Sequence, residues 1–242
     1  MKKVLIGFLF LSFIIGSFVQ AEDSDDISKK LALALVSGRH VIAVNQGLIN
    51  DATKGDKGFT ADVFVTQLTK AYKDKTGIDL STLKPDSKLN KLLLSYVKAV
   101  KAVITSNQSL INSEGVGFKG FIPAVYGKKV GDAFFAETGV KLKQTSTKYR
   151  NRANKPDAFE SGILAKFESG EYEKNVGYGV QAQKNGEDVY RYMQPIYINK
   201  ACLKCHGTPV GETDIAGRKK EGYKVGEVRG AISVMLPLSL IK

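Results

Sequence analysis

The chain has 242 residues, of which 43% are hydrophobic and 25% are charged, with only 6 prolines. This composition is that of an ordinary globular protein and excludes intrinsic disorder, collagen and low-complexity architectures. Lysine and arginine total 36 against 24 acidic residues, so the formal charge is +12. Two cysteines cannot make a disulfide-rich scaffold, and with two histidines the chain cannot form a metal site that needs three or more histidine ligands. The H-E-x-x-H, G-x-S-x-G and Walker A patterns are absent, which removes most named enzyme chemistries.

The first 21 residues resemble a secretory signal peptide. Lys2 and Lys3 precede an apolar run over residues 4–19, and small residues lead to a cleavage point after Ala21. The alternative is an uncleaved anchor, but 16 residues are short for a span of about 20. We therefore expect residues 22–242 to be a soluble protein in the periplasm or elsewhere outside the cytoplasm. No later segment is apolar enough for stable membrane insertion.

The N-terminal half has the spacing of helices. Apolar residues recur at helical intervals over residues 27–50, 60–75 and about 88–104. Asp25 or Asp26 is the predicted cap of the first helix. Gly77 ends the second helix, and residues 85–87 open the third.

The C-terminal half has the pattern of strands. Residues 176–183 and 188–198 flank Asn185-Gly186, a strong hairpin signal, and residues 231–235 form a last strand. Helices followed by antiparallel strands predict an α+β fold. We expect one domain over residues 22–242, with a helical lobe at 22–112 and a sheet lobe at 113–242.

The sheet lobe contains a C-x-x-C-H motif, which is the attachment signature of c-type haem. Two thiols at this spacing, Cys202 and Cys205, reach the two vinyl groups of one porphyrin, and His206 then gives a nitrogen to the iron. Thioether formation outside the cytoplasm agrees with the signal peptide. The sequence therefore predicts one covalent haem c.

Three other interpretations of the motif compete with haem attachment. A thioredoxin-like redox pair needs a βαβ unit, and the sequence predicts no parallel strands around it. Half of a zinc site needs further ligands, and only His40 remains. A structural disulfide leaves His206 unexplained.

Several blocks around the motif add a resemblance to a known family. They lie at residues 121–125, 144–146, 149–160, 191–198, 201–209 and 222–234. In this order they resemble single-haem c-type, PAS-like domains, long catalogued as a domain of unknown function, which occur alone in the periplasm or as sensor regions of histidine kinases. The resemblance covers about residues 27–238. It implies a PAS-like antiparallel sheet with flanking helices and a long N-terminal helix against the haem.

The chain departs from that family at two points. The family's usual Arg-Asn-Pro run reads Arg150-Asn151-Arg152 here. Some members use a helix cysteine as the distal iron ligand, and this chain has no third cysteine.

His40 is the predicted sixth ligand of the iron. It lies on the first helix with Leu33, Val36 and Val44, opposite the main apolar stripe. The alternatives are an ordinary surface or core histidine, or ligation by Met193 or Met235, which fit equally well as strand residues facing the core.

The basic residues are dispersed along the chain. Dispersed charge usually serves solubility, and here it also suits steering toward an acidic redox or signalling partner or an anionic surface. Nucleic-acid binding needs basic residues gathered with aromatics, and export argues against it. Four arginines flank the shared motifs as candidates for pairing with haem propionates: Arg150, Arg152, Arg191 and Arg229.

These features together predict an exported monohaem c-type cytochrome that acts in electron transfer or redox sensing. The alternative is a haem-based sensor of a small diatomic ligand that signals to a separate partner protein. An enzyme such as a peroxidase needs an acid–base group at an open distal site, and only one spare histidine exists. We therefore expect no enzymatic activity.

Overall fold

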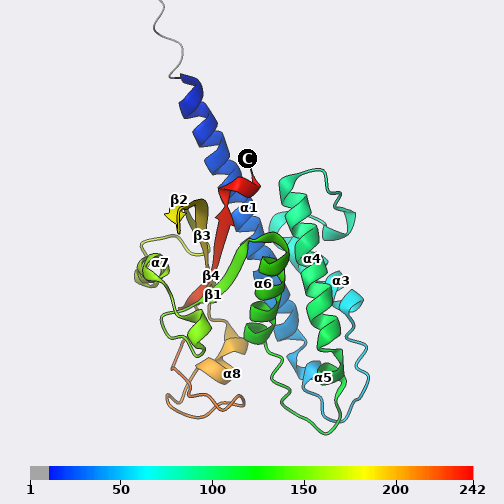
Figure 1. Cartoon of the computed structure of the whole chain (residues 1–242). Coiled ribbons are helices and arrows are strands. Elements are labelled where there is room, and N and C mark those ends of the chain that lie inside the picture. Colours follow the sequence, from blue (N-terminus) through cyan, green and yellow to red (C-terminus); the bar gives the residue numbers. More distant parts are fainter. Residues whose placement is uncertain (1–10, 242) are drawn as a thin grey trace, which may run out of the picture.

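The computed structural model describes residues 11–241, with side chains from residue 23 onward (Figure 1). The helices are α1 (Leu11–Val44), α2 (Gln46–Ile49), α3 (Ala61–Thr76), α4 (Lys88–Ser106), α5 (Gln108–Asn112), α6 (Pro123–Thr138), α7 (Ala158–Ser169) and α8 (Leu203–His206). The strands are β1 (Lys141–Thr145), β2 (Tyr178–Lys184), β3 (Glu187–Tyr197) and β4 (Val228–Pro237). Short 3-10 turns are η1 (Leu80–Thr82), η2 (Arg152–Asn154), η3 (Lys200–Cys202) and η4 (Leu238–Leu240). This is the predicted α+β class.

The four strands form one antiparallel sheet in the order β1-β4-β3-β2. Asn185 and Gly186 join β2 to β3 with positive φ angles of 53° and 84°, the two-residue turn whose twist matches that of the strands. The predicted hairpin and last strand are therefore confirmed. β1 was not predicted, because its Lys-Leu-Lys-Gln-Thr sequence has only one β-branched residue, Thr145, and two lysines.

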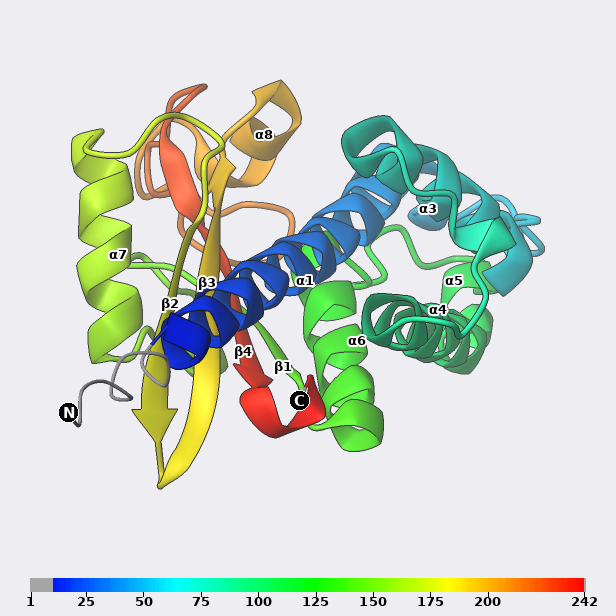
Figure 2. The same ribbon diagram turned by 90° about the horizontal axis from the view of Figure 1, so that it is seen from above.

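Helices cover both faces of the sheet (Figure 2), and each face has its own hydrophobic cluster of buried residues. On one face α1 crosses the strands and packs with α3, α4 and α6, so that Leu31, Leu35 and Ile42 are fully buried. On the other face α7 covers Met193 and Ala231. Gly38 of α1 allows this packing, because a Cβ atom there would lie 2.1 Å from the Tyr126 hydroxyl oxygen.

Helix ends follow the local signals in the sequence. Thr60 caps α3 and Gly77 ends it in the left-handed conformation, while the Ser87 side chain accepts from the Asn90 amide at the start of α4. The second and third predicted helices are thus confirmed. Three helices whose positions were not predicted, α6, α7 and the four-residue α8, lie in the predicted sheet lobe.

The first predicted helix has different bounds. It does not begin at Asp25 or Asp26, because α1 runs back without interruption to Leu11, and a separate turn, α2, covers Gln46–Ile49. The apolar segment before Asp25 contains no proline and can continue the helix. The predicted cleavage point after Ala21 falls inside α1, and residues 1–10 of the predicted signal peptide lie outside the described residues. Within the described range, no helix is long and apolar enough to span a bilayer.

Candidate functional site

The C-x-x-C-H motif lies in the connection from β3 to β4. We name residues 198–227 the motif loop. The Ile198 amide donates to the Glu227 carbonyl and the Gly226 amide to Ile198, which closes the base of the loop. Further out, the Tyr223 amide donates to the His206 carbonyl over 2.8 Å. The loop is therefore held together by backbone hydrogen bonds. Its returning segment, residues 220–227, runs beside the motif, and we name it the return pass.

Asn199 starts the motif's helical turns. Its side-chain oxygen accepts hydrogen bonds from the amides of Ala201 and Cys202 at the start of η3, and from the Cys202 thiol at 3.3 Å. η3 leads directly into α8, which carries Cys205 and His206. Both views place α8 beside the C-terminal half of α1 (Figures 1 and 2).

His206 is held by a carboxylate from the return pass. Its Nδ1 lies 2.8 Å from Glu221 Oε2, and no hydrogen bond is recorded for its Nε2 among the described residues. The two side chains are 22% and 15% exposed. Burial is the main cause that lowers the pKa of His206, so the neutral imidazole predominates at pH 7. A neutral imidazole with one nitrogen occupied presents the other as a metal ligand.

Glu221 is held in turn by arginines. Arg150 donates from Nε to Oε1 over 2.6 Å and from a terminal nitrogen to Oε2 over 2.8 Å, and Arg229 lies 3.9 Å away. Burial opposes ionisation of Glu221, but the hydrogen bonds from Arg150 and His206 outweigh it and lower the pKa of the carboxyl. Glu221 is therefore ionised at neutral pH.

Arg150 also joins the motif loop to the segment after β1. It pairs with the fully buried Asp214 side chain at 2.6 Å and donates to the carbonyl oxygens of Cys205 and Lys219. Its guanidinium has an anionic partner on each side, so it is occupied by the protein itself. Of the other arginines named above, Arg191 pairs with Asp157 on the far side of the sheet, and Arg152 is exposed.

The two thiols are free and half-buried. Burial, with the negative charge of Asp214, raises the pKa of Cys205, whereas a redox-active pair depends on a lowered thiol pKa. The sheet beside the motif is antiparallel, so it supplies no βαβ unit. No group of three metal-ligating side chains occurs in the described residues, which gives the zinc interpretation no support. These observations weigh against the three competing interpretations.

Arg39 of α1 is a half-buried cation that the sequence did not single out. Its Nε is buried without a hydrogen-bond partner, and no ion pair is recorded for it within residues 23–241. It lies near enough to Cys202 and Arg229 to interact with them electrostatically. Burial, followed by repulsion from Arg229, lowers the pKa of Arg39 to about 10. Because the Nε of Arg39 is buried without a partner and lies near a second cation, an anion would bind favourably beside it.

The predicted sixth ligands differ in exposure. His40 is exposed on α1, and Val44 one turn later is 63% exposed, while Val36 is half-buried. His40 therefore lies on an outer face of α1, and its ligation stays a prediction. Met193 is fully buried under α7, and Met235 is half-buried on β4, as expected of strand residues.

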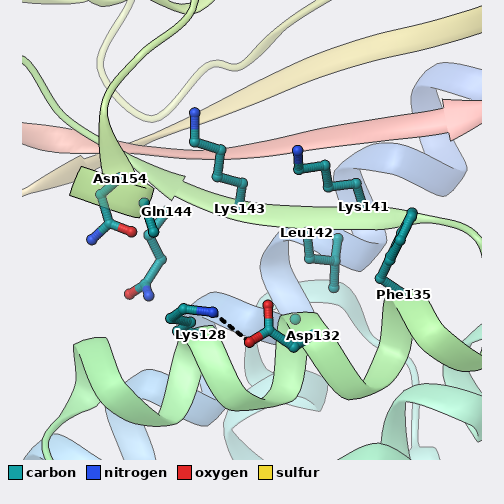
Figure 3. A pocket seen from close by; sticks show the side chains of 10 residues that line it. Lys128, Asp132, Phe135, Lys141, Leu142, Lys143, Gln144 and Asn154 are labelled. Carbon is teal, nitrogen blue, oxygen red and sulfur yellow. Dashed lines mark hydrogen bonds and ion pairs between the residues drawn. The ribbon is translucent and has the colours of Figure 1, made fainter. Parts of the chain in front are cut away.

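A separate hollow of about 270 Å³ lies between α6 and β1 (Figure 3). Leu142 and Gln144 point from β1 toward α6, whereas Lys141 and Lys143 leave the other side of the strand. Lys128 and Asp132 form an ion pair of 2.5 Å along its α6 wall. The hollow contains neither the cysteines nor His206, so it is not part of the motif site.

Glu221 and Arg39 are the residues that sequence reasoning missed. Glu221 follows His206 by 15 positions, and Arg39 precedes it by 167, so no local spacing links either to the motif. The only signal in the sequence was that Glu221 adjoins the 222–234 block.

Comparison with known proteins places the chain in a family. One solved structure, the cyanobacterial heme-protein Tll0287, matches 58% of this chain and 92% of its own with 20% sequence identity and a TM-score of 0.42. A search of curated proteins finds no match. The profile of the Tll0287-like family matches residues 81–237, well over half of the sequence, and the chain belongs to this family.

Proposed function

We propose that this chain binds one haem covalently through Cys202 and Cys205, with His206 as the proximal ligand, and acts in electron transfer or redox sensing. One observation carries the proposal: His206 keeps Nε2 free because Nδ1 is held by the ionised Glu221, one position from a free thiol. Haem c would supply the redox chemistry, and the chain would supply the axial nitrogen and the electrostatic surroundings.

The surroundings of the motif fit the chemistry of haem. Haem carries two propionate carboxylates, and Arg39 is a half-buried arginine whose buried Nε has no partner and lies near Cys202. Arg229 lies near the same place; it donates to Ser146 Oγ and the Lys148 carbonyl, and its one ion-pair contact among the described residues is with Glu221 at 3.9 Å. Arg39, whose Nε has no partner, and Arg229, which has no close carboxylate, are therefore better propionate partners than Arg150, which already pairs with two carboxylates. The family bears the name of a heme protein, Tll0287, and membership in it agrees with this assignment.

His40 remains the proposed sixth ligand. It is exposed, and the neighbouring Val44 is exposed as well. A bound prosthetic group is a physical reason for an apolar side chain and an imidazole on one outer face of a helix. The alternative function, sensing of a diatomic ligand, requires an open sixth position instead.

The proposal includes the location and the partners. We propose export to the periplasm by residues 1–21, no enzymatic activity of its own, and an acidic redox or signalling protein as partner. The positive charge of the chain supports the last of these.

Intact mass spectrometry tests the attachment. Protein made with a c-haem maturation system should have the mass of residues 22–242 plus one haem. The double variant Cys202→Ser/Cys205→Ser should lack the haem while keeping the same cleaved chain. A wild-type mass without haem, or haem that acidified organic solvent extracts, contradicts the proposal.

Optical spectra test the sixth ligand. The wild type should be low-spin and should react slowly with carbon monoxide when reduced. His40→Ala should make it partly high-spin, and His40→Met should raise the potential because thioether ligation does so. Lys29→Ala, at another exposed position of α1, is the matched control and should change neither property. A five-coordinate wild type would favour the diatomic sensor.

A further inference from the structure

A carboxylate is the hydrogen-bond partner of the Nδ1 nitrogen of His206, the proposed proximal ligand. The acceptor of His206 Nδ1 is the side chain of Glu221 at 2.8 Å, a carboxylate that the Arg150 guanidinium pairs with at 2.6 and 2.8 Å. Because an ionised carboxylate can only accept, Nδ1 must donate the proton. This sets the imidazole tautomer and directs the Nε2 lone pair away from Glu221.

We infer that Glu221 is a positioning residue that strengthens His206 as an iron ligand and keeps the bound haem in the ferric state. The inference rests on the proposed function and deepens it. A carboxylate that accepts from the far nitrogen gives the imidazole partial imidazolate character and raises its basicity. A more basic ligand and a nearby negative charge both favour ferric over ferrous iron, so the two effects have the same sign.

The arginines keep Glu221 in place without removing its bond to His206. Arg150 reaches both carboxylate oxygens, so Oε2 is shared between Arg150 and His206. A carboxylate has lone pairs for both donors. Sharing moderates the electron donation toward His206, but the two bonds from Arg150 also stop the carboxylate from rotating away. The Glu221 carboxylate is therefore held by His206 on one side and by Arg150 on the other.

A purely structural role is the competing interpretation. Glu221 would then serve only to hold Arg150, and through it the Cys205 carbonyl and Asp214. The two roles differ in what happens at the iron. Structural bracing alone would leave the iron–histidine bond unchanged as long as haem remains attached.

The experiment compares Glu221→Gln and Glu221→Asp with wild type, all with haem attached. Glu221→Gln removes the charge but keeps the shape, and Glu221→Asp keeps the charge but withdraws it by one methylene. Glu212→Gln is the matched control, because it removes an exposed carboxylate from the same loop that pairs with Lys220 and not with His206. The readouts are the midpoint potential and the iron–histidine stretching frequency after photolysis of the carbon monoxide adduct, which reports the proximal bond whatever the sixth ligand is.

Glu221→Gln should increase the ferrous-to-ferric ratio at fixed ambient potential at least tenfold, or about 59 mV for one electron. It should also lower the stretching frequency, and Glu221→Asp should lower that frequency with a smaller change in potential. The control should move neither readout.

An unchanged frequency in both Glu221 variants overturns the inference, even when the potential shifts. If Glu221→Gln does not mature, the frequency in Glu221→Asp decides alone. A wild-type chain that carries no haem by mass would instead refute the proposed function, and this inference with it.

Discussion

Arg150 and Arg39 both lie near the motif, but among the described residues only Arg150 has hydrogen-bond and ion-pair partners. Arg150 binds Asp214, Glu221 and two carbonyl oxygens, and so braces the loop with or without a ligand. Arg39 has a buried Nε with no acceptor and Arg229 nearby. A buried donor without a hydrogen-bond partner lowers the free energy of unfolding by about 1–3 kcal/mol. An anion bound to Arg39 Nε would remove this penalty.

Arg39→Met should therefore have opposite effects with and without haem. In the Cys202→Ser/Cys205→Ser chain we expect it to increase the free energy of unfolding by about 1–3 kcal/mol, since it removes the unsatisfied donor and keeps the packing. In the haem-bound protein the gain should disappear and the potential should fall, because a cation that favours ferrous iron is lost. Chemical denaturation and redox titration measure these effects. Arg152→Met, at an exposed arginine, is the control, and equal gains in both forms would contradict the idea.

The sequence predicted the residues of the site as far as their chemistry is local. Cys202, Cys205 and His206 are recognised by spacing alone. Glu221 and Arg150 are not, because they reach the motif only when the return pass of the loop and the segment after β1 come together. The candidate arginines were chosen by their closeness to the motifs in the sequence. Arg39, whose buried Nε has no hydrogen-bond partner, was missed because it lies far away in the sequence, on α1.

At the scale of elements, the second and third helices and the hairpin were predictable because their end signals agree with their apolar periods. The helices α6 and α7 had such signals as well. Pro123 is at the first turn of α6 with Gly139 after its end, and Asp157 and Glu160 form a capping box at the start of α7. Their weak apolar periodicity, in a region rich in glycine, hid them. The bounds of α1 could not be predicted, because its apolar N-terminal part has the composition of a signal peptide.

The capping box of α7 ties that helix to the sheet. Asp157 Oδ1 accepts from the Glu160 amide over 2.9 Å, and Oδ2 pairs with Arg191 at 2.8 Å. Asp157→Ala loses the cap and leaves the buried Arg191 with the longer 3.7 Å contact to Glu160 as its one ion pair among the described residues. It should therefore cost about 2 kcal/mol or more. Ser87→Ala removes a cap without an ion pair and should cost about 1 kcal/mol. Urea denaturation that gives equal losses would contradict the role of Arg191.

The same residue predicts a pH dependence. Burial opposes ionisation of Asp157, but the Glu160 amide and Arg191 together lower the pKa of the carboxyl below its usual value of about 3.9. A lowered pKa in the folded state contributes stability above about pH 4, and this contribution is lost as the pH falls through the folded pKa. Asp157→Asn keeps a capping oxygen without the charge. Its stability should therefore fall less steeply than that of wild type below pH 4, and parallel curves would contradict this.

At the scale of the whole molecule, the motif loop is the part that joins distant segments. Arg150 holds it from the segment after β1, Arg39 faces it from α1, and its base is closed by β3 and β4. Four lysines of the loop are exposed to solvent: Lys200, Lys204, Lys219 and Lys224. A haem attached at this loop would exchange electrons through a positively charged surface.

That charge predicts how small redox reagents react with the haem protein. The rate at which ferricyanide, an anion, oxidises the haem should fall as ionic strength rises, because salt screens the attraction. The rate at which hexaammineruthenium(II), a cation, reduces the haem should rise with ionic strength, because salt screens the repulsion. Lys204→Glu, on α8, should slow the reaction with ferricyanide severalfold at low salt. Lys91→Glu changes the net charge equally at an exposed position on α4 and should have little effect. Stopped-flow measurements that give the same rates for both variants would mean that net charge, and not the motif loop, steers the reagent, and the case for an acidic partner at this loop would fall.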